Sequence, residues 1–441
     1  MSLSEAVQAV PERLPAGLDY SALGSRFESI TQKRSIHIQP ASGNTFSPEG
    51  IRIIRFNITS NDYMVPETFR VQARFSVTNN AFVPLGPMSL LFSRVRVISN
   101  GVLLSDESYF DRLNALHHEW MGSDTFKDLC AESFQATDMS LNGTTDFETI
   151  NAGKSVRIQM PFVTTNTFTQ AKLLPLRWVP LVVEMELQSS FTTCCDTTNG
   201  NPQWTLSDVN ALCDVVSLDP ALDAAIQERH LTDMIPMKMR TWSTQKQVLN
   251  PAAAAEFTLT LLKGVSRLTS ICITFEGPDP GPAQKKVTTL YFPPNTHTHD
   301  PKEEGEFWIQ IGDRRMPEYP VRGVREAWYR ARLGMCHGPT SNMNYLTNLR
   351  GFGGSNEVTA GTAGGADEIG TPGKHYFALI DCEKLCGHAD YTGLDVKGGV
   401  SLYAFFRHLI SNANHGITAA YFHVNYMQHV VLSSSGVEVL E

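Results

Sequence analysis

The sequence lacks any long run of apolar residues and any basic N-terminal segment. Its opening stretch, MSLSEAVQAVPERLPAG, has neither a positively charged start nor a continuous hydrophobic run. A membrane-spanning helix needs about 20 consecutive apolar residues, and a secretory signal needs a basic start followed by an apolar segment. We therefore expect no membrane span and no secretion signal, as for a protein made inside a cell.

Cysteine is also scarce, with 8 residues in a chain of 441. Two of them, Cys194 and Cys195, are adjacent and are poorly placed to bridge each other. Small secreted domains that depend on disulfides carry a far denser set of cysteines. The sequence therefore predicts free thiols in a reducing compartment, where the sequons at Asn57 and Asn142 would not be glycosylated.

An excess of positive charge is missing as well. The formal net charge is −9, so the surface as a whole repels phosphate groups. Nucleic-acid-binding proteins usually show a basic patch or stripe. We expect no strong nucleic-acid binding.

What the sequence does contain is the pattern of a folded β protein. Hydrophobic residues make up 42% of the chain and charged residues 18%, which excludes a disordered protein. Valine, threonine and phenylalanine are frequent, and short runs alternate between apolar and polar residues, as in strands with one buried face. The chain is longer than a single domain with one hydrophobic core usually is, which favours two domains of roughly 200 residues each.

One local unit occurs twice. Phe92–Trp120 reads as a strand, a turn at Asn100-Gly101, a second strand and a helix over 109–120. Phe307–Leu333 repeats this order, with a turn at Gly312-Asp313 and a helix over 324–333. Such self-similarity predicts an internal duplication.

These patterns predict an all-β fold of two tandem antiparallel eight-stranded jelly-roll sandwiches with short helices in loops. We expect an N-terminal arm over residues 1–45, because this stretch is rich in proline, glycine and polar residues. The first jelly roll is expected over residues 46–232 and the second, with long surface loops, over residues 233–441.

Two stretches carry residues that bind metals in other proteins. His297 and His299 fall on one side of an extended segment, next to Asp300, but no third ligand is identifiable. Polar loop histidines are the favoured interpretation, and a metal at this position stays open. The stretch from Cys382 to His388, CEKLCGH, resembles half of a zinc site without the second half, so buried free cysteines are favoured. We expect neither a metal nor a cofactor.

The glycine-rich loop Gly351–Gly373 lacks the context of a phosphate-binding loop. Gly373-Lys374 is followed by His375 instead of serine or threonine, and no helix pattern starts there. The role of this loop is left open.

No catalytic residue is predicted. The sequence contains no GxSxG elbow, and paired acids such as Glu303-Glu304 are interpreted as solvated loop residues. The HHEW stretch, His117–Trp120, lacks the spacing of a zinc protease, and we attribute its histidines to the helix dipole at a C-terminus. The sequence therefore predicts a protein that is not an enzyme.

The second helix carries a basic face with interleaved acids. This pattern favours a salt-linked contact between subunits over a nucleic-acid contact. Its charged residues and their neighbours are Glu318, Arg322, Arg325, Glu326, Arg330 and Arg332.

Several stretches, in this order, resemble the double jelly-roll major capsid proteins of double-stranded DNA viruses, most closely the polinton-like virus and virophage branch. They are GNTFSPEGIRIIRFNI, VRVISNGVLLSDESYFDRLNAL, LSDVNALCDVVSLDPAL, RTWSTQKQVL, LLKGVSRLTSICITF and AYFHVNYMQHVVLSSSGVEV. None is a catalytic signature, so the resemblance depends on their order and spacing.

The resemblance implies a capsid protein of the virion that forms a homotrimer, a pseudo-hexagonal capsomer that tiles an icosahedral shell. Its implied partners are neighbouring capsomers, a penton protein and minor or cement capsid proteins. We expect the helices at Tyr109–Trp120 and Val324–Leu333 at subunit or inter-capsomer contacts, and the Gly351 loop at the outer surface.

Two alternatives share the fold class. One is a two-jelly-roll hydrolase acting on glycans or glycoproteins, which predicts a secretion signal and a cleft with clustered carboxylates. The other is a tandem-sandwich lectin, which would bind sugar as a monomer or dimer and form no shell.

Overall fold

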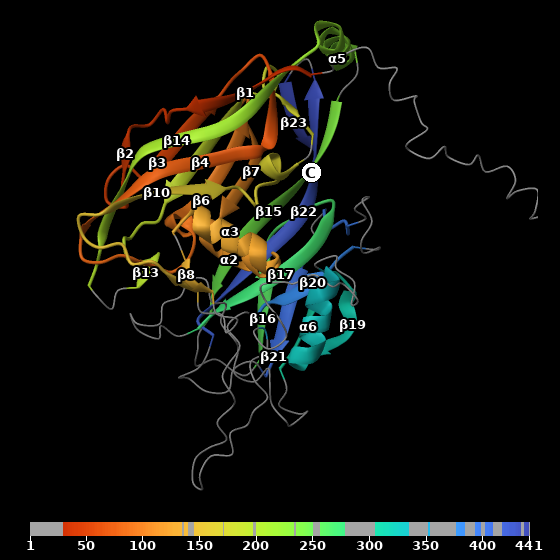
Figure 1. Ribbon diagram of the computed structural model, residues 1–441. Coiled ribbons are helices and arrows are strands. Elements are labelled where there is room, and N and C mark those ends of the chain that lie inside the picture. Colours follow the sequence, from red (N-terminus) through yellow and green to blue (C-terminus); the bar gives the residue numbers. More distant parts are fainter. Residues whose placement is uncertain are drawn as a thin grey trace, which may run out of the picture.

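The computed structural model describes residues 30–134, 136–139, 145–170, 172–196, 200–232, 235–249, 256–277, 305–334, 352, 376–383, 393–397, 402–408, 417–433 and 436–440. Within these ranges the chain is mostly antiparallel β-sheet, with few and short helices (Figure 1). No helix of the described residues is long and apolar enough to cross a membrane.

The first half of the chain forms two facing sheets. One has the strand order β1-β14-β4-β10 and the other the order β3-β12-β6-β7. Alternate side chains of both sheets point into a shared core, as the buried positions of β4 in the first sheet and β12 in the second show. The strands of the first sheet are β1 (Ile30–Ile38), β14 (Gln203–Leu218), β4 (Tyr63–Asn79) and β10 (Ser155–Pro161). Those of the second are β3 (Ile53–Ile58), β12 (Leu181–Leu187), β6 (Phe92–Ser99) and β7 (Val102–Ser108).

The second half repeats this arrangement. Its sheets have the orders β15-β22-β17-β20 and β16-β21-β18-β19. The strands of the first are β15 (Ile235–Val248), β22 (Ala419–Ser433), β17 (Leu268–Glu276) and β20 (Ala378–Asp381). Those of the second are β16 (Glu256–Leu261), β21 (Leu402–Arg407), β18 (Glu306–Ile311) and β19 (Arg314–Arg322).

The two halves share one topology. If the eight main strands of each half are numbered along the chain, both halves have the sheet orders 1-8-3-6 and 2-7-4-5. Sequential strands thus alternate between the two sheets, except for the hairpin of strands 4 and 5, in the manner of a jelly roll. The predicted duplication is confirmed, and so is the all-β fold of two antiparallel sandwiches with short helices in loops.

The repeated hairpin and helix lie at the same place in each half. Strands β6 and β7 are joined at Asn100 (φ 49°) and Gly101 (φ 83°), both with positive φ, as a tight two-residue hairpin requires. Helix α2 (Phe110–Glu119) follows β7, and helix α6 (Gly323–Gly334) follows β19. A residue with positive φ makes the strand-to-helix bend in each half: Tyr109 (φ 54°) in the first and Gly323 (φ 63°) in the second.

Three further α-helices lie in the first half: α3 (Ser123–Glu132), α4 (Asn166–Thr169) and α5 (Pro220–Thr232). A 3₁₀ helix, η2 (Met88–Leu91), precedes β6. The short strands β2 (Thr45–Phe46) and β11 (Leu174–Pro175) extend the first sheet, while β23 (Gly436–Leu440) pairs with β22.

Strand β1 lies within the stretch that the sequence assigns to an N-terminal arm, residues 1–45. Strand β1 pairs antiparallel with β14 from Ile30 to Ile38, and the side chains of Ile36 and Ile38 pack on the core of the first half. The rest of β1 is exposed and polar because it is an edge strand, which hides the alternation expected of a strand. Residues 1–29 lie outside the described residues.

The cysteines of the described ranges are free and buried. They are Cys130, Cys194, Cys195, Cys213, Cys272 and Cys382. Cys194 and Cys195 therefore do not bridge each other, as the sequence predicted. Burial raises the pKa of the Cys130 thiol to about 12, which keeps it protonated and unreactive.

Candidate assembly interface

Helix α2 lies between the two jelly rolls of the same chain (Figure 1). Phe110, in its first turn, belongs to the core of the first half, while Leu116 belongs to the core of the second half. Most of the helix is buried, including polar residues such as Asp111 and Asn114. The expectation that this helix forms a contact between subunits is wrong, because the second jelly roll of its own chain already covers it.

Aromatic rings join α2 and its flanks to the second jelly roll. The ring of Trp120 lies 5.5 Å from that of Trp242 on β15 and 6.3 Å from that of Phe377. At the other end of the helix, the rings of Tyr109 and Tyr421 meet edge to face at 5.3 Å. Aromatic pairs prefer particular ring orientations, and they contribute stability in addition to that from the area they bury. We therefore infer that the joint between the jelly rolls is rigid.

A cluster of charged residues also lies at this joint. Nη2 of Arg112 lies 3.8 Å from Oε1 of Glu276 on β17, and Nζ of Lys246 lies 2.9 Å from Oε2 of the same carboxylate. Tyr421 donates a hydrogen bond of 2.8 Å from its hydroxyl to Glu276 Oε2, and its ring lies 5.3 Å from the Arg112 guanidinium. Burial alone would raise the pKa of Glu276, but the Lys246 hydrogen bond and the Arg112 charge lower it.

Glu276→Gln is expected to reduce the free energy of unfolding at pH 7 by about 1–3 kcal/mol, because it leaves two cations at the joint without their carboxylate. The pKa of Glu276 is lower in the folded chain, so its contribution is present above its ordinary pKa and is lost as the pH falls. Urea unfolding at pH 7 and pH 4 measures both effects.

Glu256→Gln is the matched control, since Glu256 pairs with Arg407 at a side chain that is 58% exposed. We expect a change below about 1 kcal/mol for this exposed pair. Equal losses in the two variants would show that the joint gains nothing from Glu276.

Buried histidines lie on both sides of the joint. His423 on β22 is fully buried and shares hydrogen bonds with Thr244 (3.0 Å) and Thr274 (3.1 Å). Burial lowers its pKa to about 3. Burial also lowers the pKa of His117 to about 4 and that of His118 to about 3.

The helix-dipole explanation for the two α2 histidines is therefore wrong. A favourable interaction with the C-terminal dipole requires a protonated ring, and both rings are neutral near pH 7 because of their low pKa values. They serve as packing residues, as the tilted contact between His118 and Phe126 at 5.0 Å illustrates.

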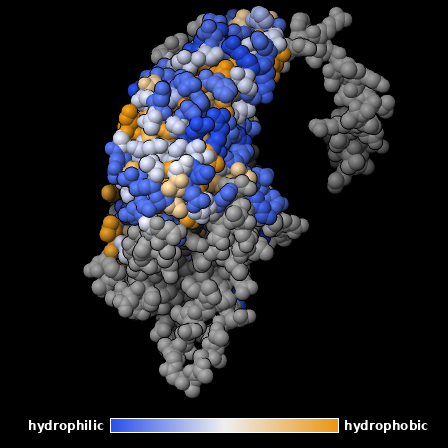
Figure 2. Space-filling model, turned by 60° about the vertical axis from the view of Figure 1, so that its left-hand side comes forward, coloured by the Kyte–Doolittle hydropathy of each residue, from blue (hydrophilic) through white to orange (hydrophobic). Residues whose placement is uncertain are grey.

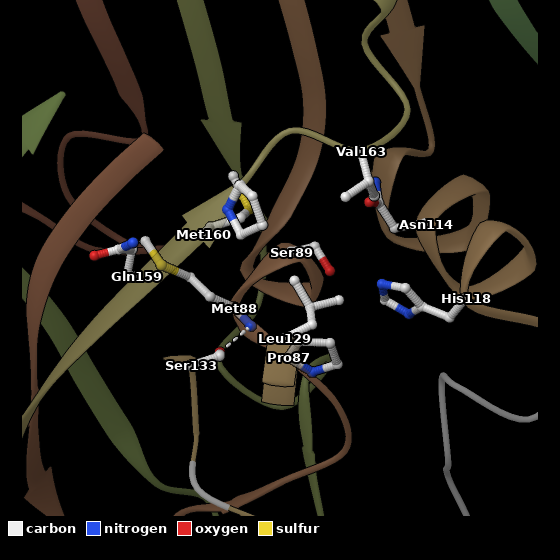
Figure 3. Close-up of a pocket in the computed structure, with 11 residues that line it drawn as sticks. Pro87, Met88, Ser89, Asn114, His118, Leu129, Ser133, Gln159, Met160 and Val163 are labelled. Carbon is white, nitrogen blue, oxygen red and sulfur yellow. Dashed lines mark hydrogen bonds between the residues drawn. The ribbon is translucent and has the colours of Figure 1, made fainter. Parts of the chain in front are cut away.

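A small cavity lies beside His118 (Figure 3). The side chains of Ser89 and His118 approach each other across it, and neither Ser89 Oγ nor the two His118 ring nitrogens have a hydrogen-bond partner in the described part of the chain. The cavity measures about 10 Å³, which is room for about a single water molecule. It is too small for an organic substrate.

Glu107 on β7 is a buried carboxylic acid. It accepts hydrogen bonds from Thr164 (2.7 Å) and Ser105 (3.2 Å). Burial raises its pKa to about 7. Raised carboxyl pKa values occur in active sites, but the groups that contact Glu107 here are hydroxyls of the protein's own interior.

The described residues show no cluster of three or more histidine, cysteine or acidic side chains that could hold a metal ion. Cys382 is buried, and burial raises the pKa of its thiol. The other candidates lie outside the described residues: His297, His299, Asp300, Glu303-Glu304, Gly373-Lys374, Cys386, His388 and, apart from Phe352, the Gly351–Gly373 loop.

Helix α6 differs from α2 because one of its faces is open. Val324, Ala327 and Ala331 are buried, whereas Tyr329 is 47% exposed and Arg325 is exposed. Beside them, Tyr319 of β19 is 60% exposed. The interpretation of this basic face as a contact between subunits stays a prediction.

No protein-family model matches the chain, and no curated protein sequence matches it. Several solved structures do match this chain. The PBCV-1 virus capsid model has 10% sequence identity and a TM-score of 0.62, over 93% of this chain and 96% of that one. The Sputnik virophage structure has 11% identity and a TM-score of 0.59, over 94% and 89%. The mavirus major capsid protein has 12% identity and a TM-score of 0.54, over 97% and 95%. The chain therefore has the fold of double jelly-roll major capsid proteins.

Proposed function

We propose that this chain is a major capsid protein, the structural subunit of trimeric pseudo-hexagonal capsomers in the icosahedral shell of a double-stranded DNA virus. The observation that carries the proposal is the repeated topology, with two jelly rolls of identical strand order held at a rigid joint. Three such chains supply six similar units around a ring.

The proposal includes a localisation and a set of partners. The chain is a component of the virion, its homotrimers contact neighbouring capsomers, and a penton protein and minor or cement proteins complete the shell. The fold shared over most of the chain with the PBCV-1, Sputnik and mavirus structures supports this assignment. In this proposal the chain has no catalytic activity, no cofactor and no strong nucleic-acid binding.

The proposal places the division between the jelly rolls at residues 232–233, between α5 and β15. With this division, the two sheets of each jelly roll are formed by strands from one continuous half of the chain. The last strands cross this division in space, because Val430, Leu432 and Val437 pack on the core of the first half. The two units are therefore fastened at both the α2 joint and the C-terminal strands.

Light scattering of the purified full chain at micromolar concentration tests the proposal. We expect about three times the chain mass of 48.8 kDa. A monomer that also binds or cleaves a glycan would favour the lectin or hydrolase alternative. A monomer without such activity would equally overturn the capsomer proposal.

A further inference from the structure

The small cavity between η2 and α2 is bordered by buried polar atoms that lack partners. Ser89 of η2 and His118 of α2 are 4% and 3% exposed. Ser89 Oγ and both ring nitrogens of His118 have no hydrogen-bond partner in the part of the chain that the structure describes. Figure 3 shows the two side chains directed towards each other from opposite walls. Two unpartnered polar groups therefore share one enclosed space.

Unpartnered polar groups are unfavourable in a protein interior. The face of the molecule shown in Figure 2 is mostly hydrophilic, as expected where polar side chains meet solvent. A buried polar group that gives up its hydrogen bonds to water without a new partner destabilises the folded chain. Protein interiors therefore leave few such groups unpaired, and ordered water satisfies many of those that the protein itself does not.

The other polar residues around the cavity already make hydrogen bonds. Ser133 Oγ accepts a hydrogen bond of 2.5 Å from the Met88 N–H, and Gln159 Oε1 accepts one of 2.6 Å from a glutamine of the neighbouring strand β4. Asn114, one turn before His118 on α2, donates from Nδ2 to a backbone carbonyl of its own helix at 2.9 Å. The remaining lining residues, apart from Ser89, are apolar.

The size and chemistry of the cavity fit a water molecule. Its volume of about 10 Å³ is that of about one water. Burial lowers the pKa of His118 to about 3, so the ring is neutral at pH 7 and carries one N–H donor and one acceptor nitrogen. The Ser89 hydroxyl both donates and accepts, so water complements either tautomer of the ring. The described residues hold no group of three or more histidine, cysteine or acidic side chains, which disfavours a metal ion here.

We propose that this cavity is a binding site for one ordered water molecule, which bridges the Ser89 hydroxyl on η2 and the imidazole of His118 on α2. The bridge fixes the orientation of the His118 ring and links the segment before β6 to the helix at the joint. The same ring packs on Phe126 of α3 at 5.0 Å, so the water positions a side chain that η2, α2 and α3 share. The site lies within one chain, so its test is separate from that of the proposed function.

A high-resolution crystal structure of the full chain is the direct test. We expect a peak of electron density in the cavity, within about 2.7–3.2 Å of both Ser89 Oγ and one ring nitrogen of His118. A cavity without such a peak would overturn the proposal. A direct hydrogen bond between Ser89 and His118 would overturn it as well.

Ser89→Ala gives a readout in solution, because the sign of its effect depends on the water. If water bridges the hydroxyl, the change removes a hydrogen bond, and the equilibrium constant of unfolding is expected to rise about 3- to 10-fold. If the hydroxyl is unpaired, the change removes an unfavourable buried group and the constant is expected to fall. Urea unfolding at pH 7 and one fixed protein concentration gives the sign, and a fall would contradict the proposal.

Ser99→Ala is the matched control. Ser99 ends β6, is fully buried and also has an Oγ without a hydrogen-bond partner among the described residues, but it does not line this cavity. Its replacement is expected to leave the unfolding constant unchanged or to lower it. Equal rises for Ser89→Ala and Ser99→Ala would show that the cavity is not the cause, and would overturn the proposal.

A double variant tests whether the two side chains share the water. In a chain that already carries His118→Phe, the further change Ser89→Ala is expected to raise the unfolding constant by no more than about 2-fold, because the water has lost its other partner. If Ser89→Ala has its full effect in both backgrounds, the two side chains act separately and the bridge is wrong.

Discussion

Leu116→Ala is expected to lower the free energy of unfolding by about 2–5 kcal/mol, the range for a large-to-small change in a packed core. Leu116 is fully buried, and although it lies on a helix of the first jelly roll, it packs in the core of the second. The variant leaves a void at the joint, so packing contacts of both jelly rolls are lost. Chemical denaturation at one fixed protein concentration measures the loss.

Leu103→Ala is its matched control, since Leu103 on β7 is 44% exposed. We expect a change within about 0.5 kcal/mol there. If Leu116→Ala weakened the oligomer while the unfolding free energy of the chain stayed unchanged, α2 would be a subunit contact and its place within the chain would be wrong.

Glu107→Gln is expected to stabilise the chain by roughly 3 kcal/mol at pH 8 and to change it little at pH 4. Burial raises the pKa of Glu107 from 4.5 to about 7. Above this value the folded chain must hold a buried carboxylate, whereas the unfolded chain ionises freely. The stability that the neutral acid gives is thus full below pH 4.5 and is lost as the pH rises through about 7.

The amide introduced by Glu107→Gln keeps the shape of the side chain and carries no charge, so the loss between pH 5 and pH 8 should shrink in the variant. Urea unfolding at these pH values gives the comparison. Glu49→Gln, at an exposed position, should follow the unchanged chain. A Glu107 variant with the same pH dependence as the unchanged chain would contradict the assignment of a buried neutral acid.

The repeated hairpin and helix could be predicted from the sequence because local chemistry determines them. Asn100-Gly101 takes the positive φ values of a tight hairpin, and Val95 and Val97 alternate with arginines that face away from the core. In the second unit, Phe307 and Ile309 also pack in the core, although Trp308 between them is buried as well. These signals depend only on neighbours along the chain.

The place of α2 could not be predicted in this way. Asp111, Asn114 and His118 read as a polar helix face, but the second jelly roll covers them. A helix buried from two sides by different domains loses the simple division into an apolar and a polar face. The sequence does indicate that β22 is buried on both sides, because aromatic residues occur on both of its faces, at Tyr421 and Phe422.

Strand β1 could not be predicted for a related reason. Its pairing partner β14 lies far away in the chain, and β1 itself exposes most of its side chains at the edge of the sheet. The groove that it shares with β14 and β4 arises only when these segments meet, so no motif in the sequence indicates it.

Electron microscopy of the purified full chain tests the central claim most directly. The account predicts particles with a hexagonal outline whose averages show threefold symmetry, because each chain supplies two similar but unequal jelly rolls. Isolated two-lobed particles at micromolar concentration, with no threefold class, would contradict it.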